Sequence, residues 1–346
     1  MSKNLLLAFL FLHACVPQKI TAANREEEPL AALQRAVITN YANILRAQYE
    51  DAWKLSLRMR TNIDSFLRNP SAAGLTSARE SWIACREPYS QSEIGRFYDG
   101  PIEPLEEYIN AWPIDLNFID YTEGMPNSGI INETNRFPQI VPGVLIGANQ
   151  EEEEGEKAVS TGFHAIEFLL WGQDLYSDSP GRRPYTDYMD AATGPGRNAA
   201  RRRQYLLVVA QLLSDQLLQV ASEWMPNNQT NYRARFISAA PEASLEKIFT
   251  GVGNLSSSEL AGERMLVPYT TRSQENEQCC FSDTTQLDLV RNQLGVQDVF
   301  LGRTKRADGS EIKGPGLLSL LERADAKLAD TLKQQLEESL SAIRAI

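Results

Sequence analysis

Apolar residues recur every three or four positions along much of the chain, which is the spacing of one face of a helix. The first run consists of Leu33, Val37, Tyr41, Leu45, Tyr49, Trp53 and Leu57. It predicts a long amphipathic helix from Leu30 to about Leu67 that ends before Pro70. A second helix is predicted through Trp82 to Pro88, where the proline should kink or end it.

The segment 95–148 breaks this periodicity because it is rich in proline, glycine, asparagine and aromatic residues. We expect only short helical pieces there, and a segment this long without clear regular structure is often functional. Helical patterns return at residues 150–172, 199–224, 242–266, 284–294 and about 315–344, with a polar loop at 268–283. Alternation typical of strands is weak everywhere.

The chain of 346 residues is too long for one ordinary domain, and the helical patterns predict an all-α fold. We expect two helical bundles of about four helices each. The stretch 177–197 is rich in glycine and proline and is the predicted connector between them. The predicted domains are therefore an N-terminal bundle at 25–176 and a C-terminal bundle at 198–346.

The first residues predict an export signal that is not part of the fold. Lys3 supplies a positive charge, and the apolar run 5–12 is too short to span a bilayer. Cys15 follows this run and resembles the lipidated cysteine of a bacterial lipobox. We therefore predict a signal peptide at 1–14 and a lipid anchor on Cys15 that holds the protein on a membrane surface. Cleavage near Thr21 to Ala23 is the alternative.

Charge and cysteine content narrow the possible partners and bonds. The formal net charge is −11, which has the wrong sign for attraction to phosphate, so we expect no nucleic-acid partner. The basic run 201–203 is interpreted as the solvated start of a helix. If Cys15 carries lipid, the cysteines that remain are Cys85, Cys279 and Cys280. A bridge from Cys85 to one of the vicinal pair is one possibility, and three free thiols are the other.

His164 is the only histidine of the predicted mature chain, because His13 belongs to the signal. The two-histidine zincin motif is absent, so a metal site would depend mainly on carboxylates and would suit iron, manganese, zinc or calcium better than copper. Glu167 lies on the same helical face among apolar residues, where an ionised carboxylate is costly unless paired or coordinated. Gly162 permits close approach of another backbone. The pair is either a structural contact or the centre of a metal or catalytic site.

The candidate ligand-binding residues are Trp82, Arg86, Tyr89, Arg96, Glu263 and Arg264. Arg86 lies four residues after Trp82 on one helical face, and a guanidinium beside aromatic rings could bind a carboxylate ligand or just hold the neighbouring loop. Glu263 and Arg264 are first interpreted as an internal ion pair. The acidic loop 274–283 could donate to a cation, although a solvated polar loop is the usual meaning of such a pattern.

Four motifs occur in the same order as in a known family. They are Trp82/Arg86/Tyr89 followed by Arg96-Phe97, then Asn110/Trp112-Pro113, then Gly162/His164/Glu167 followed by Leu-Leu-Trp-Gly, then Glu263-Arg264-Met265 followed by Cys280-Phe281-Ser282-Asp283. Together they cover most of the chain from about residue 30 to 300, and on them the sequence resembles the imelysin family. Many members have histidines beside the Cys-Phe-Ser-Asp segment, where this chain has Gln278 and Gln286.

The resemblance implies an all-α fold of two modified four-helix bundles after a cleaved export signal. It implies a protein of the bacterial cell envelope that faces the periplasm, with the outer membrane as its place. It also implies a part in iron uptake, with envelope iron-transport proteins as partners. The family is filed with metallopeptidases as well, which implies iron or zinc as the metal and Glu167 as the base if the chain is a peptidase.

We favour a non-enzymatic envelope lipoprotein that binds iron, another metal or a small ligand at a site that includes His164 and Glu167. One histidine and one glutamate are too few ligands for a hydrolytic zinc site unless distant carboxylates such as Glu263, Glu275 or Asp283 complete it. The alternatives are a metal-dependent peptidase and a purely structural module in which the pair stabilises the bundle.

Overall fold

The computed structural model describes residues 23–149, 155–191 and 194–346. Its longer helices are α1 (Ala23–Arg68), α2 (Ala72–Ser92), α6 (Gly162–Trp171), α7 (Ala199–Trp224), α9 (Pro241–Asn254), α11 (Thr285–Leu301) and α13 (Ala326–Ile343). The short helices are α3 (Glu106–Ile109), α4 (Leu116–Ile119), α5 (Pro142–Ala148), α8 (Tyr232–Ser238), α10 (Val267–Thr271) and α12 (Leu317–Ala324). Single 3₁₀ turns cover Glu93–Gly95, Glu103–Leu105, Tyr185–Tyr188, Gly194–Gly196 and Gln274–Asn276.

Two further elements complete the described chain. A π-helical segment, η6 (Leu255–Leu266), continues α9 without a break. The strands β1 (Arg303–Lys305) and β2 (Glu311–Lys313) form an antiparallel hairpin in which Thr304 faces Ile312. These are the only named strands in the described ranges, so the predicted all-α class is confirmed. The predicted signal at 1–14 and the lipidated Cys15 lie outside the described residues.

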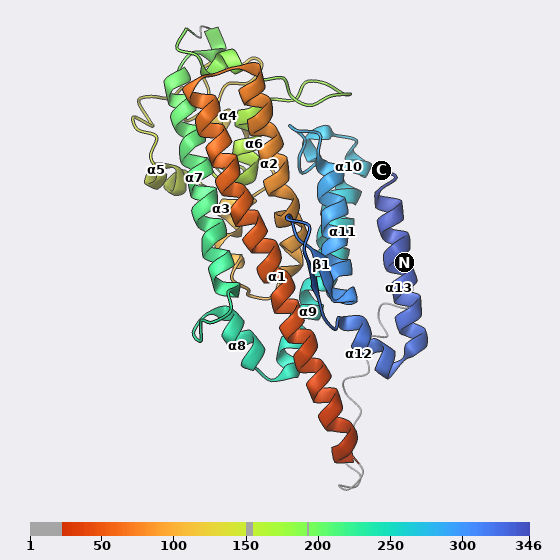
Figure 1. Cartoon of the computed structure of the whole chain (residues 1–346). Coiled ribbons are helices and arrows are strands. Elements are labelled where there is room, and N and C mark those ends of the chain that lie inside the picture. Colours follow the sequence, from red (N-terminus) through yellow and green to blue (C-terminus); the bar gives the residue numbers. More distant parts are fainter. Residues whose placement is uncertain (1–22, 150–154, 192–193) are drawn as a thin grey trace.

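Five long helices follow one another across the molecule in the order α7, α1, α2, α11 and α13 (Figure 1). The middle of the predicted apolar face of α1 is buried, at Val37, Tyr41, Leu45 and Tyr49, whereas Leu57 at its end is exposed. The Tyr41 ring lies 6.2 Å from the ring of Trp224 on α7. α7 is long and apolar enough to cross a membrane, but 67% of its most apolar window is buried within the fold. It therefore packs as a core helix against α1 and α6.

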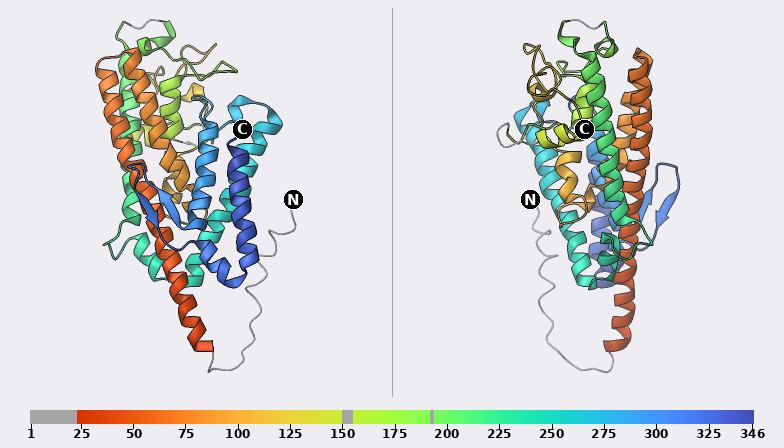
Figure 2. Two further views of the ribbon diagram at one scale, coloured as in Figure 1. Left: turned by 45° about the vertical axis from the view of Figure 1, so that its right-hand side comes forward. Right: turned by 90° about the vertical axis from the view of Figure 1, so that its left-hand side faces the viewer.

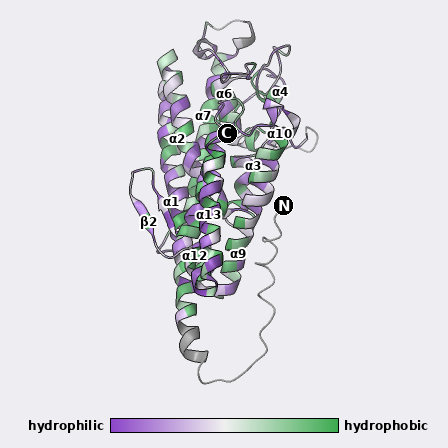
Figure 3. Cartoon of the chain, turned by 90° about the vertical axis from the view of Figure 1, so that its right-hand side faces the viewer, coloured by the Kyte–Doolittle hydropathy of each residue, from purple (hydrophilic) through white to green (hydrophobic). Residues whose placement is uncertain are grey.

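The packing crosses the predicted boundary between the two halves of the chain. α7 lies against α1 and α6, α11 lies against α2, and one apolar core extends from α1 to α12 and α13. The division into bundles at 25–176 and 198–346, joined by the connector 177–197, stays a prediction. The hairpin lies beside α1 and extends from the helices (Figure 2). α13 covers α11 with a narrow apolar stripe that includes Leu336 and Leu340, and its other residues are mostly exposed (Figure 3).

Pro88 was predicted to kink or end the second helix. It does not end the helix, because α2 continues to Ser92. A proline inside a helix removes one hydrogen bond, here to the carbonyl of Ala84. α2 is packed against both α1 and α11, and burial of its last turn outweighs the lost bond.

The predicted helix over 150–172 is too long, since α6 begins only at Gly162. Gly162 has a φ of +82°, and a Cβ there would lie 2.5 Å from the carbonyl oxygen of Ile109. The expected close approach of another backbone is therefore confirmed, and it fixes the start of α6. The acidic run 151–154 lies outside the described residues. The predicted terminal helix is also divided, because the Asp325 carboxylate accepts a hydrogen bond from the Leu328 amide and starts α13 anew.

The interpretation of the basic run 201–203 as solvated surface is wrong for Arg202. Its side chain is fully buried, and its Nε donates to Asp120 Oδ2 at 2.7 Å. Asp120 lies 82 positions earlier in the chain, so no local pattern could indicate the pair. The two possibilities for the cysteines are also resolved, because Cys85, Cys279 and Cys280 are buried free thiols.

Asp298 of α11 is a buried acid where α2 meets the hairpin. The side-chain amides of Gln48 and Gln91 donate to Oδ2, the former at 3.0 Å, and burial raises the pKa of Asp298 to about 7. In an unfolded chain the pKa of aspartate is about 3.9. Because the folded state binds the proton more tightly between these values, the stability that Asp298 contributes is present at low pH and is lost as pH rises through 7.

Asp298→Asn is therefore expected to remove a pH-dependent part of the folding free energy. The free energy of unfolding of the wild type, relative to the variant, should fall by on the order of a few kcal/mol between about pH 4 and pH 8. Urea unfolding of both proteins across this range measures the difference. A difference that does not change with pH would contradict the prediction.

Candidate functional site

α6 places His164 and Glu167 one turn apart in the interior of the protein. Both side chains are 0% exposed, and His164 Nδ1 lies 2.9 Å from Glu167 Oε2. The structure thus confirms that the two residues share a buried helical face. Residues that flank them on α6, including Phe163, Ile166 and Phe168, are also buried, so water has no path along the helix itself.

Glu167 is held by the loop that precedes α11. Its Oε1 accepts hydrogen bonds from the Ser282 amide at 2.9 Å and from the Ser282 hydroxyl at 2.7 Å. Burial nevertheless raises the pKa of Glu167 to about 8, because the two bonds offset only part of the cost of desolvating the carboxylate. Glu167 is therefore mainly protonated at neutral pH in the metal-free protein.

His164 is shifted toward its neutral form as well. Burial lowers its pKa well below the usual 6.5, and the positive charges of Arg86 and Arg264 act in the same direction. The contact between His164 and Glu167 is consequently a hydrogen bond between neutral groups at pH 7 and not an ion pair. His164 Nε2 is buried and has no hydrogen-bond partner among the described residues. An unpartnered ring nitrogen in the interior is costly, which makes His164 a candidate for contact with a ligand.

Cys279 is the third group of the site, and it was not among the predicted site residues. One donor atom each from His164, Glu167 and Cys279 lies within 4.8 Å of the other two. Cys279 Sγ also lies 3.1 Å from Asp288 Oδ2, to which the thiol donates. Burial, followed by the negative charge of Asp288, raises the pKa of Cys279, so the metal-free site holds a thiol and not a thiolate.

A buried ion pair positions Cys279 and joins α2 to α11. Arg86 donates to Asp288 from Nη2 at 2.8 Å and from Nε at 3.0 Å, and it also donates to the side-chain oxygen of Asn110. The Ser90 hydroxyl also donates to the same carboxylate, at 2.7 Å. Arg86 is thus satisfied within the protein, which fits the second of its two predicted roles, that of holding the neighbouring loop.

Trp82 and Tyr89 surround Arg86 and support α6. Trp82 Nε1 donates to the carbonyl of Phe163 at 3.0 Å, and the Arg86 guanidinium lies 5.6 Å from the centre of the Tyr89 ring. Both aromatic side chains are buried. They hold the helix that carries His164, and the Tyr89 hydroxyl has no hydrogen-bond partner among the described residues.

Arg96 and Arg264 belong to a second buried cluster centred on Glu93. Arg264 Nη2 lies 2.5 Å and Arg96 Nη1 lies 3.0 Å from Glu93 Oε2. Burial alone would raise the pKa of Glu93, but Arg264 and Arg96 outweigh it and lower the pKa to about 2. The predicted pair between Glu263 and Arg264 is wrong, because Glu263 is exposed and Glu259 takes its place at 2.9 Å. The helical register changes in η6, which a period of 3.6 residues could not anticipate.

A cavity of about 580 Å³ lies beside the buried site. Its wall includes Trp112, Asp115, Lys157, Glu275, Cys280 and Phe281. The Trp112 ring lies 5.0 Å from the His164 ring and 5.9 Å from the Phe281 ring. The irregular segment 95–148 contributes to the surroundings of the candidate site, since it supplies both Trp112 and Asn110.

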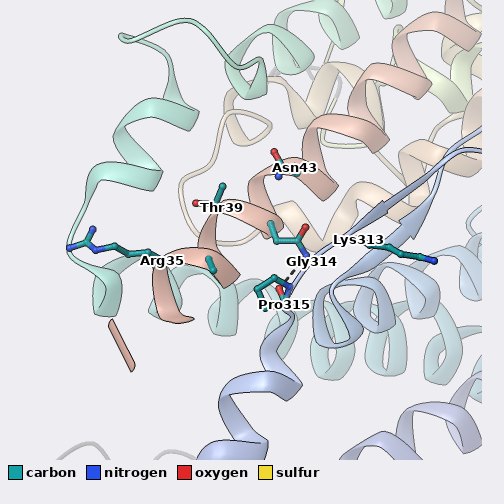
Figure 4. Close-up of a pocket in the computed structure, with 8 residues that line it drawn as sticks. Arg35, Thr39, Asn43, Lys313, Gly314 and Pro315 are labelled. Carbon is teal, nitrogen blue, oxygen red and sulfur yellow. Dashed lines mark hydrogen bonds between the residues drawn. The ribbon is translucent and has the colours of Figure 1, made fainter. Parts of the chain in front are cut away.

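A second hollow of about 350 Å³ lies far from these residues. It is bordered by Arg35, Thr39 and Asn43 of α1 and by Lys313 to Pro315 at the end of the hairpin (Figure 4). Asn40 fastens the hairpin there by donating to the carbonyl oxygens of Gly302 and Pro315. None of the predicted site residues contributes to this hollow, so we assign the chemistry to α6 and its surroundings.

Comparison with known proteins identifies the family of this chain. A family model described as imelysin matches residues 45–346, which include all three donor residues. The chain belongs to the imelysin family. It is 25% identical over 292 residues to iron-regulated protein A of Synechococcus elongatus, an alignment that covers 82% of this chain and 67% of the relative.

Two solved structures share the fold of this imelysin-family chain. A putative iron-regulated protein A precursor from Parabacteroides distasonis superposes with a TM-score of 0.66 at 17% identity, covering 91% of this chain and 86% of the other. An imelysin-like protein from Psychrobacter arcticum superposes with a TM-score of 0.61 at 15% identity, covering 95% and 86%. At these identities the two structures support the all-α imelysin fold and no finer statement.

Proposed function

We propose that this imelysin-family protein binds iron or another divalent transition-metal ion and serves iron acquisition, with His164, Glu167 and Cys279 as the donor set. The observation that supports the proposal most directly is the close group of three buried donor residues, His164, Glu167 and Cys279, with a His164 Nε2 that has no hydrogen-bond partner among the described residues. The name of the related iron-regulated protein A also connects this family with iron.

The donor set suits iron(II) or zinc. Imidazole and thiolate are preferred by these ions, and donors around a tetrahedral ion lie about 3.5 Å apart, so the spacing of up to 4.8 Å needs only small side-chain movements. Glu167 and Cys279 would each lose a proton on binding. Their two negative charges would balance a divalent ion, which lowers the cost of placing that ion in a buried site.

Peptide hydrolysis is the second candidate, and the geometry favours it less. A peptidase must bring a scissile bond to the metal and keep an open position for water. His164 and Glu167 are both 0% exposed, and Trp112 lies against the histidine ring. Binding without hydrolysis therefore fits the described site better.

The cellular setting is part of the same proposal and rests on the sequence. A lipid anchor at Cys15 would hold the protein at the outer membrane, facing the periplasm, where envelope iron-transport proteins would be its partners. The anchor lies outside the described residues, so it stays a prediction. The buried free thiols require that Cys279 remain reduced or metal-bound in that compartment.

Titration of the purified mature protein with Co²⁺ tests the metal proposal, because cobalt bound to a thiolate absorbs in the near ultraviolet. We expect saturable binding of one ion per chain together with this absorption band. Zn²⁺ and Fe²⁺ added under anaerobic conditions should displace the cobalt. Absence of saturable binding for all three ions would refute the proposal, and cleavage of a peptide library with added Zn²⁺, Mn²⁺ or Fe²⁺ would favour the peptidase instead.

A further inference from the structure

The cavity of about 580 Å³ and the buried donor set share a wall made of two aromatic rings. Trp112 lines the cavity on one side and lies 5.0 Å from the His164 ring on the other. Phe281 lines the same cavity and packs against Trp112 at 5.9 Å and against Phe168 at 5.5 Å. Because His164 is 0% exposed, an ion in the cavity can reach it only if side chains move, and Trp112 is the cavity-lining residue whose ring lies against His164.

The loop 274–284 contacts both the cavity and the buried donor residues. Glu275 and Cys280 of the segment 274–284 line the cavity, while Ser282 of the same segment donates two hydrogen bonds to Glu167. Cys279, a member of the donor set, immediately precedes Cys280. A movement of this loop that displaces Phe281 would therefore also loosen the bonds that hold Glu167 in its metal-free position.

The cavity has the size and charge for a hydrated cation. Its charged lining residues are Asp115, Glu156, Glu275 and Lys157. Three carboxylates and one ammonium group leave a net negative charge, which attracts cations and repels anions. A divalent ion with six waters fills about 200 Å³, since one water takes about 30 Å³ in the liquid, so the cavity holds the ion with its hydration shell.

We propose that this cavity is the entry site for a hydrated divalent cation, and that Trp112 and Phe281 form the gate through which the ion, losing its water, passes to His164, Glu167 and Cys279. The inference rests on the proposed metal binding and adds the route by which the ion reaches the donor residues. Trp112 is the better position for a test of the gate. It is only half-buried, whereas Phe281 is almost wholly buried, so removal of the Trp112 ring disturbs the core less. The gate controls the rates of binding and release more than the affinity.

Stopped-flow mixing of the full mature protein with Co²⁺ tests the gate. The thiolate absorption band reports the association and dissociation rates of the ion. Trp112→Ala is expected to raise both the association and the dissociation rate by about tenfold or more, while Kd stays within about threefold of wild type. Trp112→Phe keeps a ring over His164 and should restore slow binding. Trp53→Ala is the matched control, since Trp53 is another half-buried tryptophan, located on α1, and its loss should leave both rates unchanged.

The outcomes separate the gate from the metal proposal. If the wild type binds Co²⁺ and Trp112→Ala binds it at the wild-type rate, the gate is wrong and the metal site stands. If the wild type binds no ion, the metal proposal itself fails. If Trp112→Ala does not fold, Trp112→Leu takes its place with the same expected acceleration.

The entry site has a test of its own. The double variant Asp115→Asn, Glu275→Gln removes two of the negative charges of the cavity without touching the donor set. Association of Co²⁺ should slow by about threefold to tenfold at low salt, and the difference from wild type should shrink at about 0.5 M salt because the attraction is screened. Equal rates for the variant and the wild type at low salt would show that the ion enters elsewhere.

Discussion

His164→Ala is expected to weaken Co²⁺ binding by at least about 100-fold, because it removes the only imidazole of the described site and the ring nitrogen that has no other partner. Cys279→Ser should abolish the near-ultraviolet absorption of bound cobalt, since a serine hydroxyl gives no such band. Glu167→Gln keeps the shape of the side chain but not its charge, and we expect a loss of about tenfold or more. Calorimetry and absorption titration measure the three effects.

The same variants distinguish a metal site from a structural contact. If the His164–Glu167 pair only stabilises the bundle, His164→Ala lowers the melting temperature and leaves metal binding as in the wild type. Asn40→Ala is a matched control, because it also removes a buried polar side chain, but one that fastens the hairpin far from the site. Asn40→Ala should lower stability without changing the affinity for Co²⁺.

The centre of the site could be predicted from the sequence because its signal is local. His164 and Glu167 are three residues apart in an apolar helical segment, and a helix places such residues on one face. Gly162 likewise indicated a close backbone approach that the structure confirms at Ile109. Patterns of this kind depend on the period of the helix alone, so they need no knowledge of the tertiary fold.

The rest of the site could not be predicted because its signals are not local. Ser282 donates to Glu167 across 115 positions, and no spacing rule connects them. Cys279 appeared in the sequence as one of several thiols with an open bonding state, and only the packing of its loop against α6 brings it beside His164 and Glu167. The resemblance to the family pointed to the Cys-Phe-Ser-Asp segment as a whole, but it gave no role to the cysteine that precedes it.

Errors at charged residues have a common physical cause. The surroundings of Arg202 and Glu263 were both predicted from their neighbours in the sequence. The partner of a buried charge depends instead on the tertiary fold. Arg202 finds Asp120, and Arg264 finds Glu93 and Glu259 in place of Glu263. A buried guanidinium without a carboxylate is so costly that the chain must bring one from wherever the topology allows.

Asp120→Asn is expected to be the most destabilising single substitution of a charged residue that we consider, at about 3–5 kcal/mol. Asp120 is fully buried at the end of α4, and it accepts hydrogen bonds from Arg183 and from Arg202, each at 2.7 Å. Burial works against its ionisation, but the two arginines outweigh it and lower the pKa of Asp120, so the carboxylate is charged at neutral pH. The neutral amide would leave the buried Arg202 guanidinium without a counter-charge and Arg183 with only Asp187, at 3.4 Å.

A neighbouring ion pair supplies the control for this prediction. Asp190 pairs with Arg203, the residue next to Arg202, but its side chain is 84% exposed. Asp190→Asn should therefore cost less than about 1 kcal/mol. Urea unfolding at neutral pH compares the two variants with wild type. A loss of less than about 1 kcal/mol for Asp120→Asn would mean that water or a rearranged side chain reaches the two arginines, and that this cluster does not fasten α4 to α7 as the described contacts indicate.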